Sequence, residues 1–153
     1  MSIIKQLLNR WLRKVEKPRF QRGTPAALRR ALVAQSRLFF RGPRGTVSNW
    51  TSFGGIPCKA VTVPSSMDAR VLFYIHGGGF VFGSPDTHSA MAAQLAHRIG
   101  ARVILPRYGL APEIPFPAAP EDIRAAWDGL IASGVDPQNV VLGGDSAGGA
   151  LAF

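Results

Sequence analysis

The chain of 153 residues is predicted to fold as an α/β domain with a mostly parallel sheet of five strands, preceded by a helical segment. Strand and helix patterns alternate after residue 45, and the connections between them are short, as in βαβ units. Two Gly-rich turns directly follow apolar strands. The composition, with 46% hydrophobic and 18% charged residues, suits one globular domain and disfavours a disordered chain.

Residues 1–44 are predicted to form two helices that carry most of the positive charge. This segment holds twelve Lys and Arg side chains against a single acid, within a net charge of +9 for the chain. Residues 3–17 fit an amphipathic helix that Pro18 is expected to end, and a second helix should run from its N-cap Thr24 to about Phe39. The apolar face of the first helix comprises Ile3, Ile4, Leu7, Leu8, Trp11, Leu12 and Val15.

The rest of the chain is predicted to form the sheet and the helices that cover it. Residues 46–53 and 56–63 roughly alternate in polarity around a Gly-Gly turn, which predicts a hairpin. After a polar turn at 64–69, residues 71–75 are continuously apolar, as in a strand buried on both faces. The remaining predicted elements are a helix at 87–99 ended by Gly100, a strand at 101–108, a helix at 120–133 and a strand at 139–144.

A serine lies on a Gly-rich turn near the end of the chain. Residues 144–148 read G-D-S-A-G, with an apolar strand before and the start of a helix after, which is the context of a nucleophile elbow. Glycines are needed there because a strand that turns directly into a helix crowds the neighbouring side chains. The pattern makes Ser146 a candidate nucleophile, and a Gly-rich turn without chemistry is the alternative interpretation.

A second Gly-rich turn, His76-Gly77-Gly78-Gly79-Phe80, follows the strand at 71–75. Three successive glycines leave backbone N–H groups approachable, as stabilisation of a developing oxyanion requires. Nucleotide binding is the competing interpretation, but neither turn contains G-x-G-x-x-G or G-x-x-x-x-G-K-[ST]. The two turns in this order therefore favour acyl transfer.

The segments "HGGGF", "GSPDTH", "YGLAPEIPFPAAPED" and "GGDSAGG" resemble the hormone-sensitive lipase family of α/β-hydrolases, whose microbial members are carboxylesterases. The resemblance implies the N-terminal portion of an α/β-hydrolase fold, with cap helices at 1–44 and a partial core at 45–153. It implies that Ser146 is the nucleophile and that His76 and Gly77 brace the glycine loop. The implied oxyanion hole consists of the backbone N–H groups of Gly78, Gly79 and Ala147.

The implied activity is hydrolysis of small-molecule esters with short to medium acyl chains, without a metal or organic cofactor.

The family usually reads D-Y-R-L-A-P-E where this chain has Arg107 and Gly109 at the first and third positions, which removes two polar anchors of that loop. The family also places its catalytic acid and histidine well downstream of the elbow. We therefore expect an N-terminal half that lacks both and is inactive by itself.

No residue present is predicted to replace the missing acid and base. His88 shares a helix face with apolar residues and should pack near the pocket rim, whereas His97 should be solvated. Asp145 is expected to point away from the nucleophile, and every acid in the chain to serve as a cap, a surface charge or a loop anchor. Cys58, the single cysteine, is expected to be an inert strand residue and fits a reducing cytoplasm.

Two other functions remain open at this point. One is a non-catalytic binder of small molecules on the same scaffold, as in the plant gibberellin receptors that the chain also resembles. The other assigns the basic helix at 3–17 to an anionic membrane surface or a partner, instead of a cap over the site.

The chain has no signal peptide and no run of eighteen apolar residues, so a cytoplasmic protein without a membrane span is predicted. Nucleic-acid binding is disfavoured because no recognition motif accompanies the charges.

Overall fold

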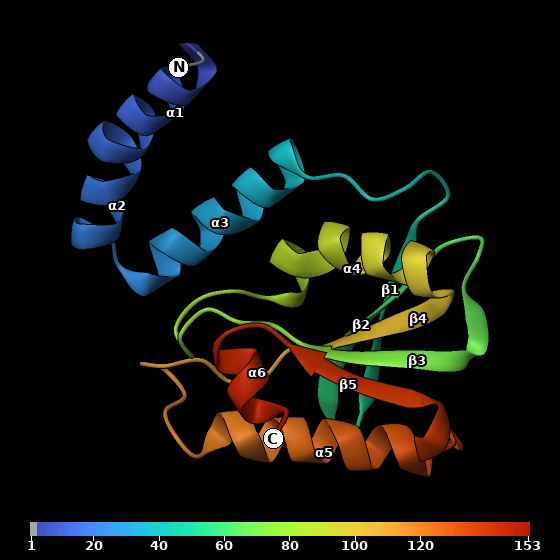
Figure 1. The fold of residues 1–153 in the computed structure, drawn as a ribbon. Coiled ribbons are helices and arrows are strands. Elements are labelled where there is room, and N and C mark those ends of the chain that lie inside the picture. The colour runs from blue at the N-terminus through green and yellow to red at the C-terminus, as the bar shows by residue number, and fades with distance from the viewer. Residues whose placement is uncertain (1–2) are drawn as a thin grey trace.

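The computed structural model describes residues 3–153 as a five-stranded sheet between two layers of helices (Figure 1). Helix α4 (Pro85–Ile99) covers one face, and α5 (Ala118–Ala132) and α6 (Ala147–Leu151) cover the other. The strands are β1 (Val47–Phe53), β2 (Ile56–Thr62), β3 (Met67–Ile75), β4 (Ala101–Pro106) and β5 (Val140–Gly144). The other helical elements are α1 (Ile3–Trp11), η1 (Leu12–Glu16), α2 (Lys17–Arg22), α3 (Pro25–Phe39) and η2 (Pro137–Asn139).

The sheet is mixed, with the strand order β1-β2-β4-β3-β5. The pairs β1/β2 and β2/β4 are antiparallel, whereas β3 pairs in parallel with both β4 and β5. Helices α4 and α5 provide the connections that parallel strands need. The predicted α/β class and the five strands are confirmed, and the parallel part consists of β3, β4 and β5.

Alternation along β3 divides the core between the two faces of the sheet. Phe73 and Ile75 belong to a buried cluster with Leu130 of α5, whereas Leu72 packs with Ala92 of α4. At the end of β3, Ile75 pairs with Gly144 of β5. Because these two strands are parallel, the HGGG loop and the serine turn leave the sheet next to each other.

The prediction that Pro18 ends the first helix is wrong. The chain continues from α1 through the π-helical turn η1 into α2, which contains Pro18 in its first turn. In η1 the N–H of Lys17 donates to the carbonyl of Leu12, five residues back. Pro18 lies directly after this π-helical turn, where the hydrogen-bond pattern of the helix changes.

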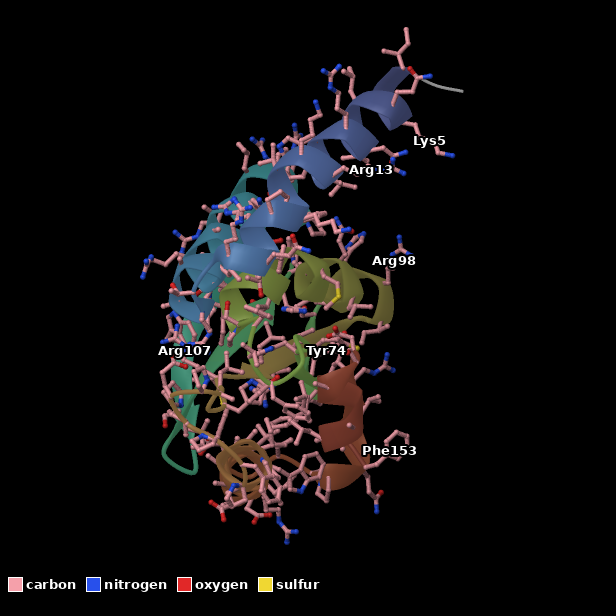
Figure 2. The ribbon with its side chains drawn as sticks, turned by 90° about the vertical axis from the view of Figure 1, so that its left-hand side faces the viewer. Lys5, Arg13, Tyr74, Arg98, Arg107 and Phe153 are labelled. Carbon is pink, nitrogen blue, oxygen red and sulfur yellow. The ribbon has the colours of Figure 1, made fainter. Side chains whose placement is uncertain are left out.

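The apolar face of α1 is largely exposed, with Ile3 at 73% and Leu7 at 62%. Figure 2 shows α1 and η1 extending beyond the rest of the fold, with Lys5 on α1 and Arg13 on η1. A cap helix over the site would pack this face inward, and such packing is not seen in the described chain. The first two residues of the predicted cap, and the side chain of Ile4, lie outside the described part. Across residues 3–153, the helices lack the length and apolar character that a membrane crossing requires.

Several element boundaries differ from the prediction. Helix α4 begins at Pro85 instead of residue 87, because the side chains of Ser84 and Thr87 cap each other's backbone N–H groups in a capping box. Strand β3 begins at Met67, inside the predicted polar turn, and a bulge separates this residue from the regular pairing with β4. Gly100 ends α4 in a left-handed conformation, as predicted.

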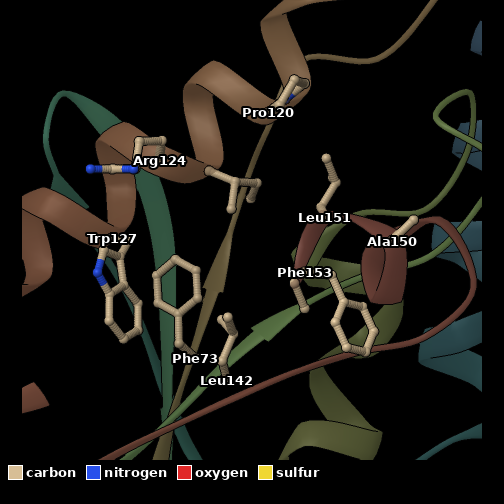
Figure 3. Close-up of a pocket in the computed structure, with 10 residues that line it drawn as sticks. Phe73, Pro120, Arg124, Trp127, Leu142, Ala150, Leu151 and Phe153 are labelled. Atoms are coloured by element: carbon tan, nitrogen blue, oxygen red, sulfur yellow. The ribbon is translucent and has the colours of Figure 1, made fainter.

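Strand β5 is an edge of the sheet and borders an apolar groove. Val141 is 63% exposed and Leu142 is 41% exposed, which is high for apolar strand residues. A groove of about 520 Å³ lies between α5, β5 and α6 (Figure 3). Its apolar lining includes Phe73, Ile123, Trp127, Leu142, Leu151 and Phe153. Ser146 is not among the residues that line this groove. The groove is therefore an uncovered face of the core and not the candidate site.

Candidate functional site

Ser146 lies on the turn that joins β5 to α6, in a backbone conformation that few side chains adopt. Its φ of 51° and ψ of −121° fall outside the regions favoured by L-residues, as expected of a strained turn at a functional position. Ser146 is the N-cap of α6, yet its side chain makes no capping hydrogen bond, and the residue is exposed. Its hydroxyl is therefore available to a ligand.

The glycines on either side of Ser146 are required by close backbone contacts. A Cβ atom on Gly148 would collide with the carbonyl oxygen of Ile75 and lie 2.7 Å from that of His76. A Cβ atom on Gly144 would lie 2.5 Å from the carbonyl carbon of Gly148. The serine turn therefore packs closely against the end of β3, where the HGGG loop begins.

The HGGG loop forms a turn built on residues with positive φ. Gly78 and Gly79 have φ values of 126° and 61°, and Phe80, with a φ of 60°, continues the turn. The carbonyl of Gly78 accepts hydrogen bonds from the N–H groups of Val81 at 3.1 Å and Phe82 at 2.8 Å. Within residues 3–153, the N–H groups of Gly78 and Gly79 have no backbone acceptor. The family resemblance implies that these two N–H groups are donors of an oxyanion hole.

Asp145 joins the serine turn to the HGGG loop. Its Oδ1 accepts hydrogen bonds from the N–H of Gly77 at 2.9 Å and from the hydroxyl of Tyr74 at 3.0 Å. Burial, with the nearby Asp145 as a second cause, raises the pKa of Tyr74 to about 12, so this hydroxyl stays protonated as a donor. Asp145 is therefore a loop anchor, one of the roles expected for the acids of the chain.

His76 is buried and is hydrogen-bonded at the start of the loop. Its Nδ1 lies 2.9 Å from the carbonyl of Gly77, which can only accept, so this nitrogen carries the proton. Its own carbonyl accepts a 2.6 Å hydrogen bond from Tyr108, whose ring stacks on the imidazole with centroids 4.4 Å apart. Burial lowers the pKa of His76 to about 4, so the side chain is neutral near pH 7.

His88 lies near the loop but has its own partners. Its Nδ1 is 2.9 Å from the hydroxyl of Thr87 and 3.2 Å from the carbonyl of Ser84, and its Nε2 is 3.5 Å from Asp145. It lines a cavity of about 330 Å³ together with Gly78, in agreement with the predicted place at a pocket rim.

The other predicted residues also have defined places. His97 is exposed, with its Nδ1 3.4 Å from the hydroxyl of Ser65. Cys58 is fully buried in β2, and burial raises the pKa of its thiol to about 11, which agrees with an inert role. Among the described residues, neither a histidine nitrogen nor a carboxylate lies within hydrogen-bonding distance of Ser146.

The loop after β4 is well anchored despite its departures from the usual family pattern. Arg107 lies over the ring of Trp50 at 4.3 Å and 3.6 Å from Asp86. The N–H of Gly109 donates to Asp122 at 2.7 Å, and a Cβ at this glycine would lie 2.7 Å from the side chain of Ile114. The anchors expected to be missing are thus replaced by contacts from other elements.

Comparison with known proteins agrees with this geometry. A family model described as an alpha/beta hydrolase fold matches residues 72–153, which is more than half of the chain. The chain belongs to the α/β-hydrolase family. The matched segment contains both Gly-rich turns.

Similar proteins include members of the resembled family. The solved structure of an esterase from the bacterial hormone-sensitive lipase family is 39% identical, with a TM-score of 0.80 over 86% of this chain and 44% of that one. An esterase of Acinetobacter venetianus is 35% identical over 129 residues, or 84% of this chain and 42% of the relative. LipR of Mycobacterium tuberculosis is 34% identical over 151 residues, or 99% and 49% of the two chains. The chain spans about half or less of the length of these proteins.

Proposed function

We propose that this α/β-hydrolase chain supplies the nucleophile and the oxyanion donors of a carboxylic ester hydrolase that acts on short to medium acyl esters. The observation that carries the proposal is the Asp145 carboxylate, which holds the HGGG loop beside the turn of Ser146. The serine hydroxyl and the N–H groups of Gly78 and Gly79 are thereby presented at one end of the sheet. The esterases among the similar proteins support the same reaction.

In the proposed reaction, Oγ of Ser146 attacks the ester carbonyl carbon while its proton passes to a base. The carbonyl oxygen becomes an oxyanion that accepts hydrogen bonds from Gly78, Gly79 and Ala147. Collapse of this intermediate breaks the bond to the alcohol oxygen, which leaves with the proton from the base. Water then attacks the acyl-serine and releases the carboxylic acid. We assign the base to a segment that corresponds to the part of the relatives outside the matched region.

The proposal is tested by Ser146→Ala in the protein as its gene encodes it, with p-nitrophenyl acetate and p-nitrophenyl butyrate as substrates. We expect ester turnover to disappear while the melting temperature stays within a few degrees of the parent protein. The matched control is Ser52→Ala, which changes an exposed serine of β1 at the opposite edge of the sheet. Turnover that survives Ser146→Ala would overturn the assignment.

The non-catalytic binder makes a different prediction in the same protein. Ester analogues would protect it against thermal unfolding, but the parent protein would give no turnover above the Ser146→Ala level. The absence of a base near Ser146 among residues 3–153 is the observation that keeps this alternative in view.

A further inference from the structure

Arg29 of α3 is hydrogen-bonded to two loops that are far away in the sequence. Its Nε donates to the carbonyl of Val81 at 2.7 Å, and its Nη2 donates to the carbonyl of Ala111 at 2.6 Å. The same Nη2 donates to Glu113 at 2.8 Å. Arg29 lies in the basic N-terminal segment, where its sequence context does not distinguish it from the other cations.

The first of these loops contains the oxyanion donors. Val81 closes the turn on Gly78, because its N–H donates to the carbonyl of that glycine at 3.1 Å. The carbonyl of Phe80 accepts a hydrogen bond from the N–H of Ala111 at 2.8 Å. Ala111 and Arg29 thus bind the carbonyls of Phe80 and Val81, the two residues after the glycines. Arg29 also binds the carbonyl of Ala111 itself.

These contacts oppose a local tendency of the loop to relax. Phe80 has a φ of 60°, which is unfavourable for a bulky residue and persists only when its surroundings enforce it. A guanidinium suits this task because it is always charged and its donors lie in a rigid plane. The bond to Glu113 contributes less, since this carboxylate is exposed and its attraction is screened by water.

We propose that Arg29 is a positioning residue that couples helix α3 to the oxyanion loop and sets the direction of the Gly78 and Gly79 N–H groups. The inference rests on the proposed ester hydrolysis. It assigns to α3 a function besides covering the site, because a shift of the helix would move the carbonyl of Val81 and with it the turn that begins at Gly78.

The test compares Arg29→Ala, Arg29→Lys and the matched control Arg30→Ala in the protein as its gene encodes it. Arg30 is the next residue on α3, is exposed and carries the same charge, so its removal controls for net charge and helix propensity. The readouts are kcat and KM for p-nitrophenyl butyrate, the melting temperature, and the rate at which diethyl p-nitrophenyl phosphate labels Ser146. Labelling requires the oxyanion donors, whereas melting reports only the fold.

We expect Arg29→Ala to lower kcat by about 10- to 100-fold, the effect of a small misplacement of catalytic groups, while KM changes by less than about threefold. The labelling rate should fall in parallel. Arg29→Lys should lie between Arg29→Ala and the parent protein, because an ammonium keeps the charge but loses the planar set of donors. Arg30→Ala should behave as the parent.

Equal kcat values for folded Arg29→Ala and Arg30→Ala proteins would overturn the inference. A loss of activity that is fully explained by the fraction of unfolded Arg29→Ala protein would also overturn the inference. If Arg29→Ala does not fold, Arg29→Lys decides, and a parental kcat in that variant counts against a positioning role. The parent and Ser146→Ala proteins, measured alongside, show separately whether the proposed hydrolysis itself holds.

Discussion

The carboxylate of Asp145 accepts a hydrogen bond from the backbone N–H of Gly77 at 2.9 Å and thereby connects the two Gly-rich turns of the sheet. Gly77 is buried, and a Cβ atom there would collide with Asp145 itself. The residue before Ser146 thus fixes the first peptide of the HGGG loop. Its role in the site is to hold this loop, without any contact to a reacting group in the described structure.

We predict that Asp145→Ala destabilises the fold by about 1–3 kcal/mol, because it leaves the buried Gly77 N–H without an acceptor. In the full gene product kcat should also fall, by about 100-fold, since the loop is no longer held in place. Asp145→Asn should retain most of both properties, because an amide oxygen can accept the same hydrogen bonds. Thermal melting and ester kinetics measure the two effects.

The control for this change is Asp68→Ala, which removes an exposed carboxylate at the start of β3. It should leave both stability and kcat near the parental values. An Asp145→Ala protein as stable and active as Asp68→Ala would show that the loop is held by other contacts.

The buried His76 predicts a loss of stability in mild acid. Its pKa is lowered to about 4 in the folded chain, whereas an unfolded histidine titrates near pH 6.5. Below about pH 6.5 the unfolded chain therefore binds a proton that the folded chain does not, and stability falls as the pH drops toward 4. The contribution of this residue is complete above pH 6.5, and about 2 kcal/mol of it should be lost by pH 5.

Denaturant unfolding at several pH values, for the parent protein and for His76→Gln, measures this term. Glutamine keeps a side-chain donor but does not titrate, so the other acids and histidines cancel in the comparison. The parent should lose about 2 kcal/mol more than the variant between pH 7.5 and pH 5. Parallel curves for the two proteins would mean that His76 is accessible to protons in the folded state.

Two neighbouring glycines in α6 should respond in opposite ways to alanine. Gly148→Ala is predicted to cost more than about 4 kcal/mol, because its Cβ would collide with the backbone of Ile75 and no flexible side chain could move away. Gly149→Ala should be neutral or stabilising by up to about 1 kcal/mol, since its nearest neighbour would be 3.5 Å away and alanine favours helices. Expression yield and thermal melting compare the two, and similar effects would show that the serine turn adapts to a side chain.

The two Gly-rich turns were predictable from the sequence because their chemistry is local. The glycines, the strand before each turn and the helix after the second one all lie within a few residues of Ser146 or Gly78. The α/β class was predictable for the same reason, since each strand and helix has its own periodicity. Short capping signals are harder to interpret. The capping box of Ser84 with Thr87 places the start of α4 two residues earlier than predicted.

Contacts between distant segments were outside the reach of the sequence. Arg29 binds residues 52 and 82 positions away, and in a basic segment its sequence context does not set it apart. Tyr74 lies in an apolar run of the sequence, and nothing in that run indicates that its hydroxyl donates a hydrogen bond to Asp145. Pro18 was misleading because a proline normally ends a helix, whereas here the π-helical turn before it shifts the hydrogen bonds.

The exposed edge of β5 predicts that residues 1–153 self-associate when they are expressed alone. Val141 and Leu142 are 63% and 41% exposed on an unpaired edge strand, next to the groove lined by Phe73 and Trp127. An apolar edge of this kind is a template for pairing with another chain. Val141→Lys should reduce the association, because a charge on an edge strand opposes such pairing. Sedimentation velocity of the two proteins measures it.

The same preparation should show no ester turnover above the small residual level that oxyanion donors give without a complete triad. Ser146 has no base within reach among residues 3–153, so its hydroxyl would rarely lose its proton at neutral pH. The comparison with Ser146→Ala in the same 153-residue chain is decisive. A monomer with a cooperative melt, and with turnover that this change abolishes, would mean that His88 or another residue interpreted as structural acts as the base.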